Sequence, residues 1–484
     1  MNMTFEEALR RQMEYFRIPG VTATVVKGDE VQYYCLGVKD ITGAASNQVD
    51  PQTLFTLASL SKSFNTAMLA RLVDEGILDW DVPVREYAPE LRMMDPEADE
   101  GMTLRDMLCH RTGLANHDAI WPSEFSHEEA AKCLRYMKPN QKFRSVSQYN
   151  NTIYMLSGYV AEAATGKTWH ELIKEYIFDP LGMTHSCSEL SKMVASGNFA
   201  EPHKYLHGTV QKVDRWPMDQ AAAAAGVNSC AEDMAKWLKF HLTGGLGPDG
   251  TRLLSEKTFN EIHKGAMPSS GSNLHSDEIK LTQYALGWRE GTYRGHRIST
   301  HTGHIEGYCS IEMVLPDDGI GVFISLNQHD GCYEVHQRAA YTAIDNLLGY
   351  EKNWLTNVKE EGLCPDHLYL DCFIDHTPLA KYYCSKTYPL DALTGTYVSQ
   401  AYGPLRIFER DDKLYSAYHF KEDELLHKQG TTYVADGFLE DTYFMKMPFE
   451  FVPEENSTED APAIRALMIP LELTVEPIEF VKAE

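Results

Sequence analysis

The 484-residue sequence lacks several features that would assign it to common classes of protein. It has no run of about 18 apolar residues, so no membrane-spanning helix is expected. Its first residues hold neither a basic nor an apolar stretch, so no signal peptide is expected. Lys and Arg number 44 against 70 Asp and Glu, a formal charge of −26. That balance argues against binding nucleic acid or an anionic membrane surface.

The sequence also lacks any C-x-x-C pair, because its ten cysteines are scattered along the chain. In a large chain without a signal peptide, this usage is typical of reduced thiols in a cytosol. We therefore expect a cytoplasmic protein.

Strand patterns lie at both ends of the first 350 residues, with mostly helical patterns between them. A helix at 4–16 and a hairpin at 21–34 come first, and strands return at 284–328 before a last helix at 332–348. An antiparallel sheet that joins the two ends, flanked by helices, closes such a chain best. The sequence thus predicts an α+β domain over 1–350, with the helical middle inserted as a second lobe.

The pattern changes after a predicted linker at 351–386. Short strands separated by turn residues follow, for example at 393–398, 405–408 and 413–418. Such a series suggests a small β-barrel. We therefore expect a separate C-terminal domain over 387–484.

Ser59 and Lys62 form the single S-x-x-K spacing in the chain. Residues three apart share one face of a helix. A serine hydroxyl is a poor nucleophile until a base takes its proton, and a lysine desolvated in a pocket can assist. Backbone N–H groups at the helix N-terminus would stabilise the developing negative charge. The pair is a candidate nucleophile and activating partner, although a capping serine before a surface lysine gives the same letters.

Tyr149-Asn150-Asn151 is a second candidate element. A phenol beside a lysine can carry a proton, so Tyr149 is a candidate catalytic residue, and Asn151 can orient a substrate amide. The alternative is a polar turn before a helix near 152–165, which is the favoured interpretation when the element is taken alone.

His301-Thr302-Gly303-His304 is the third element, near the start of the C-terminal strands. A glycine on an edge strand lets a ligand approach the backbone closely. The N–H just past Gly303 could join that of Ser59 as an oxyanion hole. We take His301, Gly303 and His304 as candidates for substrate binding.

A metal site is the rival interpretation of the two histidines. Residues three apart on a strand point to opposite faces, and the chain has no H-E-x-x-H motif. We therefore expect neither a metal nor an organic cofactor.

The three elements, in this order, resemble the penicillin-recognising serine hydrolases of the class C β-lactamase and D-alanyl-D-alanine carboxypeptidase type, which include D-aminopeptidases and esterases. The segments 108–114, 225–237 and 284–288 resemble further parts of that family. The resemblance covers about 5–350 and implies a β-lactamase/transpeptidase-like fold. Residues after about 385 resemble the lipocalin-like β-domain attached to some members.

The resemblance implies an acyl-enzyme formed on a small amide or ester, with D-amino-acid peptides among the candidates. The usual lysine of the third element is His301 here, a variant of non-lactamase members that makes binding of a substrate carboxylate less assured. An esterase or acyltransferase that uses the same acyl-serine, and a penicillin-binding sensor without turnover, stay open as alternatives. The expected partner is a small molecule, and assembly into a homo-oligomer also stays open.

Overall fold

The computed structural model describes residues 4–43, 47–121, 124–206, 208–269, 274, 276–329, 334–351, 354–355, 372–373, 379–436, 445–458, 461–472 and 474–483. Within these ranges, internal contacts divide the chain into two units. The first comprises Met1–Ala88, Met102–Arg111 and Ile153–Leu368, and the second comprises Pro89–Gly101, Thr112–Thr152 and Tyr369–Glu484.

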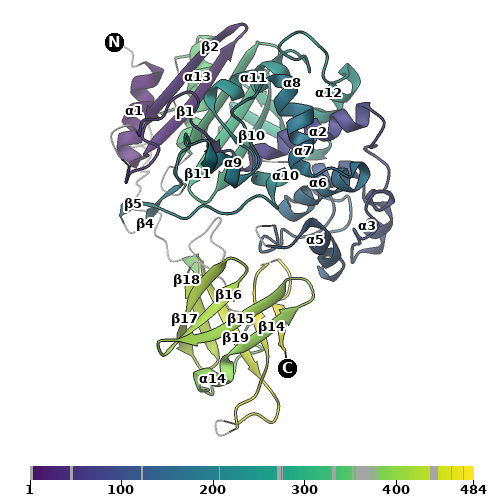
Figure 1. Cartoon of the computed structure of the whole chain (residues 1–484), viewed down its shortest axis with the longest axis vertical. Helices are drawn as coiled ribbons and strands as arrows, with labels where there is room; N and C mark the ends of the chain where they lie inside the picture. The colour runs from purple at the N-terminus through teal and green to yellow at the C-terminus, as the bar shows by residue number, and fades with distance from the viewer. Residues whose placement is uncertain are drawn as a thin grey trace. The chain divides into compact units, whose positions relative to one another are not determined.

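The first unit contains an eight-stranded sheet with the order β2-β1-β12-β11-β10-β9-β8-β7. Its strands are β1 (Gly20–Lys27), β2 (Glu30–Gly37), β7 (Met267–Pro268), β8 (Ile279–Tyr284), β9 (Arg289–Tyr293), β10 (His296–Ile305), β11 (Tyr308–Leu315) and β12 (Ile320–Leu326). β1 pairs antiparallel with β12, so the purple strands of the N-terminal hairpin lie beside green strands in Figure 1. The expected joining of the two ends in one antiparallel sheet is confirmed.

Helices cover both faces of this sheet. On one face, α1 (Phe5–Phe16) and α13 (Val335–Leu348) share a hydrophobic core with Ile311 of β11. On the other, α2 (Ser61–Asp74) lies near α11 (Ala231–Leu242), whose Trp237 donates a hydrogen bond of 2.8 Å to Glu312 of β11. Neighbouring residues of a strand point to opposite faces, so β11 separates these two layers.

Shorter elements, mostly helical, lie between β2 and β7. They are β3 (Phe55–Thr56), η1 (Ala58–Leu60), η2 (Val84–Glu86), α3 (Pro96–Gly101), α4 (Leu104–Leu108), α5 (His127–Cys133), η3 (Leu134–Tyr136), α6 (Asn151–Thr165), α7 (Trp169–Ile173), η4 (Lys174–Phe178), α8 (Asp179–Leu181), α9 (Leu190–Ala195), β4 (His203–Leu206), β5 (Thr209–Lys212), α10 (Ala222–Ala225), β6 (Asn228–Ser229) and α12 (Glu256–Ile262). The predicted helical insertion between the two groups of strands is therefore present.

α2 is buried along its N-terminal half, including the polar side chains of Lys62, Ser63 and Asn65. Burying a polar or charged group costs stability unless it is hydrogen-bonded. Each of these side chains therefore needs a hydrogen-bond partner inside the fold. Those hydrogen bonds fix the position of the start of α2.

The second unit contains a closed β-barrel. Its strands are β14 (Gly395–Ser399), β15 (Gly403–Arg410), β16 (Lys413–Tyr418), β17 (Lys421–Gln429), β18 (Thr432–Asp436), β19 (Met445–Pro453), β20 (Ile464–Ile469) and β21 (Ile478–Lys482), with α14 (Leu390–Leu393) before them and β13 (Cys372–Phe373) on the edge of β19. β20 pairs with both β19 and β21, which closes the ring. The small C-terminal barrel predicted from the sequence is confirmed.

The segment 112–152 packs with the barrel in the second unit. His117 Nδ1 lies 2.5 Å from the hydroxyl of Tyr402, and its backbone N–H donates to Glu472 over 3.1 Å. Asn140 donates to Thr474 over 2.7 Å. Most of the predicted linker 351–386 lies outside the described residues, so the predicted domain boundaries stay a prediction.

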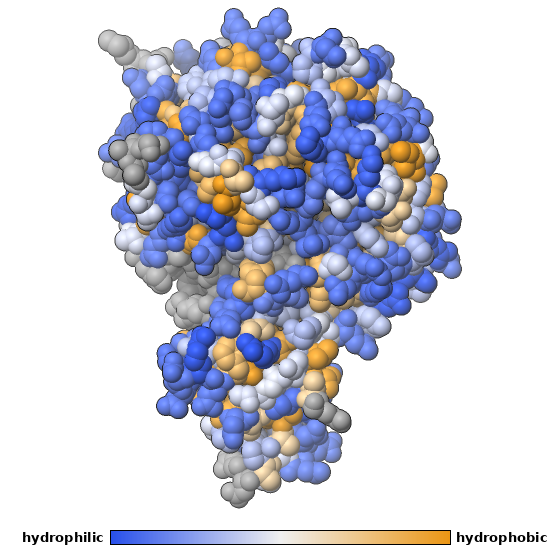
Figure 2. Space-filling view, viewed as in Figure 1, coloured by the Kyte–Doolittle hydropathy of each residue, from blue (hydrophilic) through white to orange (hydrophobic). Residues whose placement is uncertain are grey.

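On the face drawn in Figure 2, hydrophobic residues are scattered in small groups among hydrophilic ones. No helix in the described part of the chain combines the length and the apolar character that crossing a membrane requires.

Candidate active site

Ser59 and Lys62 meet at the start of α2, inside the first unit. Ser59 lies in η1, and the Lys62 ammonium donates to its Oγ over 2.9 Å. The same ammonium donates to the backbone carbonyl of Ala224 over 2.9 Å. Lys62 is fully buried, and its Nζ lies 5.4 Å from the centre of the Tyr154 ring. The S-x-x-K spacing therefore places a desolvated amine against a hydroxyl, which is the arrangement that activates a serine.

The turn before Ser59 has an unusual backbone. Ala58 has φ of 51°, in the left-handed region that non-glycine residues rarely adopt. Neighbouring hydrogen bonds hold this turn: Leu57 N–H donates to Val227 C=O over 2.9 Å, and Val227 N–H donates to Ser61 Oγ over 2.9 Å. Strained backbone of this kind is concentrated at functional sites.

Gly303 of β10 lies directly against this turn. A Cβ atom at position 303 would lie 2.2 Å from the Leu57 carbonyl oxygen and 3.1 Å from the Ser59 nitrogen, so glycine is required for the close approach. β9 pairs only with the part of β10 before His301. Among the described strands, β10 therefore has an open edge beside Ser59, where a ligand backbone could align.

His301 points to the same face of the sheet as Gly303 and takes part in a hydrogen-bond chain. Its Nδ1 lies 2.7 Å from the Thr302 carbonyl, so Nδ1 carries the proton and Nε2 accepts from the hydroxyl of Tyr284 over 2.9 Å. The Tyr284 oxygen in turn accepts from His110 Nε2 over 3.2 Å. Burial, with the nearby charges of Lys62 and Arg289, lowers the pKa of His301 well below its ordinary value. His301 is thus a neutral residue that cannot replace the cationic lysine.

His304 points to the other face of β10. It pairs across the strands with Cys309, which belongs to the core beneath α1 and α13, whereas Gly303 pairs with Ser310, which donates to Leu57 C=O over 2.6 Å. The structure therefore brings Ser59, Lys62, His301 and Gly303 together and separates His304 from them.

Tyr149 and Asn151 belong to the second unit. Asn151 is the first residue of α6, and its amide donates to Asp118 over 3.3 Å. Asn150 donates to the Ala115 carbonyl. The role of Tyr149 and Asn151 thus stays a prediction from the sequence.

Sequence reasoning gave no chemical role to His110, Tyr154, Tyr284 or Arg289, which surround Lys62 and His301 in the first unit. The signal was present for His110 and Tyr284, because both lie in segments that resemble the family. Nothing in the local pattern around Arg289 indicates its proximity to His301.

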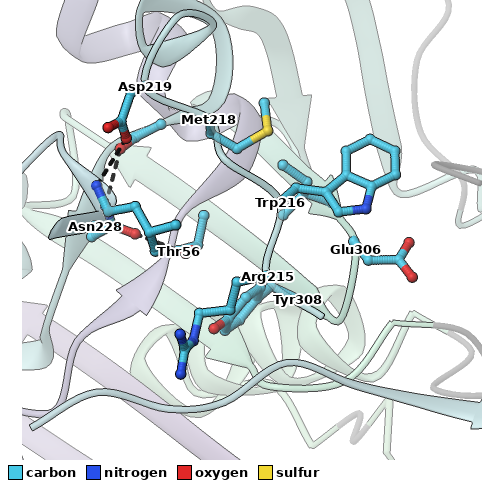
Figure 3. Close-up of a pocket in the computed structure, with 11 residues that line it drawn as sticks. Thr56, Arg215, Trp216, Met218, Asp219, Asn228, Glu306 and Tyr308 are labelled. Carbon is cyan, nitrogen blue, oxygen red and sulfur yellow. Dashed lines mark hydrogen bonds between the residues drawn. The ribbon is translucent and has the colours of Figure 1, made fainter. Parts of the chain in front are cut away.

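A pocket lies in the first unit, built from segments that also hold Ser59 and Lys62. It encloses about 380 Å³, including space open to solvent, and Figure 3 shows its lining by Thr56, Leu190, Arg215, Trp216, Met218, Asp219, Gly226, Asn228, Ile305, Glu306 and Tyr308. Thr56 precedes Ser59 by three residues, and Gly226 closely follows Ala224. Two of the lining residues thus come from segments next to those that carry Ser59 and bind Lys62.

The charged groups of this pocket are paired. Arg215 binds Glu201 over 2.6 Å, and Glu306 binds Lys204 over 2.8 Å. Asp219 accepts a hydrogen bond from the Leu190 backbone over 2.8 Å. With its aromatic and apolar walls, the pocket favours an uncharged ligand group.

A family model described as Beta-lactamase matches residues 5–344. A curated relative, "Unguisins hydrolase ungD'" of Aspergillus campestris, is 26% identical over 361 residues, covering 72% of this chain and 66% of that protein. The chain thus spans slightly less than two thirds of the length of this relative.

Two solved structures share the fold. The octameric penicillin-binding protein homologue from Pyrococcus abyssi aligns with a TM-score of 0.60 and 19% identity, over 99% of each chain. The class C beta lactamase from Rhodobacter sphaeroides aligns with a TM-score of 0.58 and 22% identity, over 71% of this chain and 99% of that chain.

Proposed function

Since the chain belongs to the beta-lactamase family and is a serine hydrolase of that type, we propose that it cleaves a small amide or ester through an acyl-enzyme on Ser59. The observation that carries this proposal is the 2.9 Å contact between Nζ of the buried Lys62 and Ser59 Oγ. A base positioned in this way can take the hydroxyl proton as Oγ attacks.

In the first step, Lys62 is in its neutral amine form, and Ser59 Oγ bonds to the substrate carbonyl carbon while its proton passes to the Lys62 amine. The bond to the amine or alcohol then breaks, and the leaving group takes a proton. We propose that the Ser59 N–H and the N–H just past Gly303 hold the oxyanion; the support is the close approach of Gly303 to Ser59. Water then attacks the acyl-serine and releases the acid, with Lys62 again moving the proton.

We propose Tyr149 as the group that carries the proton between Lys62 and the leaving group, and Asn151 as a ligand of the substrate amide. Both roles rest on the sequence motif and the family resemblance. A fold of this kind does not by itself decide among amidase, esterase and acyltransferase, because the acceptor depends on the shape of the site.

We infer a preference for substrates without a carboxylate beside the scissile bond. The support is that His301 is neutral and Arg215 is already paired with Glu201, which leaves Arg289 as the cation near His301 that a carboxylate could contact. The named substrate of the fungal relative, unguisins, and D-amino-acid peptides are candidates within this class. Cytoplasmic location and a homo-oligomeric assembly remain predictions.

A covalent probe tests the proposal. A fluorophosphonate should add once, on Ser59, as seen by mass spectrometry of the intact protein and its peptides. Ser59→Ala should lose both the adduct and the hydrolysis of a chromogenic ester, and Ser191→Ala, at an exposed position, should retain them. An adduct elsewhere, or full activity in Ser59→Ala, would contradict the mechanism.

A substrate panel separates the alternatives. It should contain D- and L-aminoacyl amides, short-chain esters and a chromogenic cephalosporin. Steady release of product indicates an enzyme, whereas a single burst indicates a sensor that is acylated without turnover. Formation of a new ester or amide with an added alcohol or amine would indicate an acyltransferase.

A further inference from the structure

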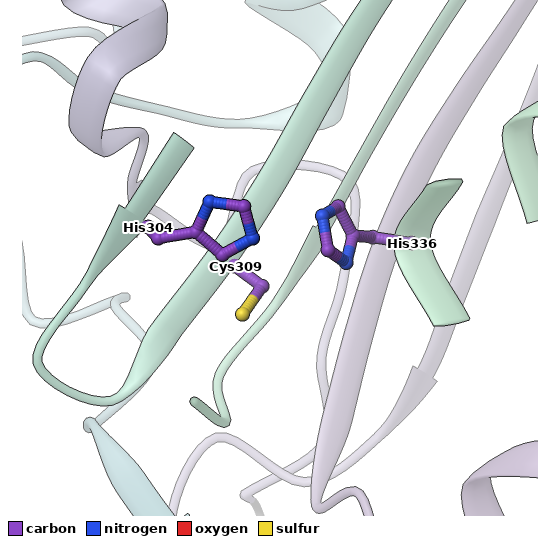
Figure 4. A group of neighbouring side chains, drawn as sticks. All are labelled: His304, Cys309 and His336. Carbon is purple, nitrogen blue, oxygen red and sulfur yellow. The ribbon is translucent and has the colours of Figure 1, made fainter. Parts of the chain in front are cut away.

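Three potential metal ligands meet on the face of the sheet opposite Ser59. His304 of β10 and Cys309 of β11 are direct cross-strand partners, and His336 lies on α13. Figure 4 shows the two imidazole rings next to each other, edge to face, with Cys309 between them. The ligand atoms of the three residues all lie within 4.8 Å of one another.

Among the residues that the structure describes, His336 has no hydrogen-bond partner that would explain its burial. Its side chain is fully buried, and neither ring nitrogen has a partner. The carboxylate of Glu334 lies 3.7 Å from Nε2, beyond hydrogen-bonding distance. Buried polar groups without a partner are rare in native proteins, and an ion is one of the few ways to satisfy them.

A further imidazole borders the cluster. The ring of His329 lies 5.8 Å from the ring of His304, and its buried Nδ1 also has no partner in the described part of the chain. Two strands, a helix and the chain after β12 thus place three imidazoles and a thiol in one region. This set of soft and borderline donors is the kind that zinc binds, whereas calcium and magnesium prefer oxygen ligands.

We propose that His304, Cys309 and His336 bind one zinc ion, with His329 as the candidate fourth ligand. Tetrahedral zinc with bonds of about 2.0–2.3 Å places its ligand atoms about 3.5 Å apart, so the side chains close in by about 1 Å on binding. The Cys309 thiol loses its proton to solvent, and the thiolate binds the ion. The half-buried His304 gives the ion a route from solvent.

The site is structural, since its ligands and Ser59 lie on opposite faces of the sheet. A bound ion would link β10 and β11 to α13, and β10 carries Gly303 against Ser59. The inference does not depend on the proposed reaction, and its test uses no activity measurement.

The test begins with the full-length protein freed of metal by a chelator. Zinc is then added, and native mass spectrometry and a thermal melt report stoichiometry and stability. We expect one zinc per chain and a melting temperature several degrees higher, because a ligand that binds only the folded state stabilises it. Cobalt should give a thiolate charge-transfer band in the absorption spectrum.

Variants identify the ligands. Cys309→Ser and His336→Gln should each weaken zinc binding at least tenfold and remove most of the thermal shift. Cys35→Ser, a half-buried thiol on β2 of the same sheet, should keep both. If a variant misfolds, the cobalt absorption band of the unchanged protein still tests whether a thiolate binds the ion.

Three results would overturn the inference. They are absence of a stoichiometric zinc ion, unchanged binding in Cys309→Ser, and cobalt binding without a thiolate band. In each of them, the contact between His304 and His336, with ring centres 5.1 Å apart and planes at 74°, is ordinary edge-to-face packing.

Discussion

Glu312 is a carboxyl group buried on the Ser59 face of the sheet. Burial raises its pKa to about 8, even though Ser63 and Trp237 hydrogen-bond to it. The folded protein therefore holds it protonated at neutral pH, while in the unfolded chain it ionises near its ordinary value. Its contribution to stability is fully present below the unfolded pKa and is lost as the pH rises through about 8.

Replacing Glu312 with glutamine should remove this pH dependence. The amide keeps an acceptor for Trp237 and has no proton to lose, so the variant should gain stability relative to the natural chain as the pH rises from 5 to 9. Chemical denaturation across that range measures the difference. Glu30→Gln, at an exposed position on β2, is the matched control. A difference that does not change with pH would show that Glu312 is not protonated in the fold.

Tyr284 positions His301 through a single hydrogen bond. Tyr284→Phe removes the donor to His301 and the acceptor for His110 while keeping the ring. A hydrogen bond is worth about 1 kcal/mol, so we expect kcat/KM to fall by about five- to tenfold, with a lower melting temperature because buried His110 and His301 each lose a partner. Tyr176→Phe, whose hydroxyl donates to Glu75 at the C-terminal end of α2, should not alter kcat/KM. Equal loss in both variants would indicate a general effect of losing a hydroxyl.

At the level of elements, the sequence predicted contacts between residues that are close along the chain. It also predicted that the strands at the two ends of the first 350 residues join in one sheet. Ser59 and Lys62 are three residues apart on helical geometry, so their contact is local. The alternation of β10 correctly separates His301 from His304. The proximity of His336 to His304 and Cys309 could not be predicted, because it depends on how α13 packs on β11. The spacing of residues along the sequence does not indicate which strand a distant helix will contact.

The contact between β10 and η1 gives a direct test of this geometry. Gly303→Ala would place a Cβ 2.2 Å from the Leu57 carbonyl, so the strand and the turn must separate. A displacement of this order at an oxyanion site costs about a hundredfold in rate. We expect kcat/KM to fall by about that factor, with a smaller loss of stability. Steady-state kinetics and a thermal melt measure the two effects.

A matched glycine controls for the general effect of adding a methyl group. Gly101 has one neighbour within reach, 3.8 Å from an added Cβ, so Gly101→Ala should leave kcat/KM unchanged. Normal kinetics in Gly303→Ala would show that this approach is not part of the oxyanion site.

At the scale of the whole molecule, the second unit joins two stretches far apart in sequence. The spacing of turn residues predicted the barrel strands, but no sequence pattern predicted that the barrel packs with 112–152. That packing includes single polar contacts such as Glu472 with the backbone of His117, and ring contacts such as Phe125 with His419. Sequence patterns report burial and turns, and such long-range hydrogen bonds leave no periodic signal.

The packing suggests that the barrel holds the segment carrying Tyr149. Glu472 and Tyr402 hold His117, and further along the segment Gln148 donates to Asn140 over 2.8 Å, the residue that also binds Thr474. Two hypotheses differ in outcome. If the barrel positions the segment that carries Tyr149, it affects the reaction of every substrate. If the barrel is a gate, it restricts the access of large substrates only.

The double variant Tyr402→Phe/Glu472→Gln in the full chain distinguishes these hypotheses. It removes a hydroxyl and a carboxylate that hold His117, so hydrogen exchange should speed up around 112–121. If the barrel positions the segment, kcat/KM should fall by about tenfold or more for small and bulky esters alike. If the barrel is a gate, bulky esters should gain relative to small ones. Lys413→Gln, whose ammonium pairs with Glu424 on the barrel surface over 2.9 Å, should change neither. Faster exchange with unchanged kinetics for both esters would show that the barrel serves stability alone.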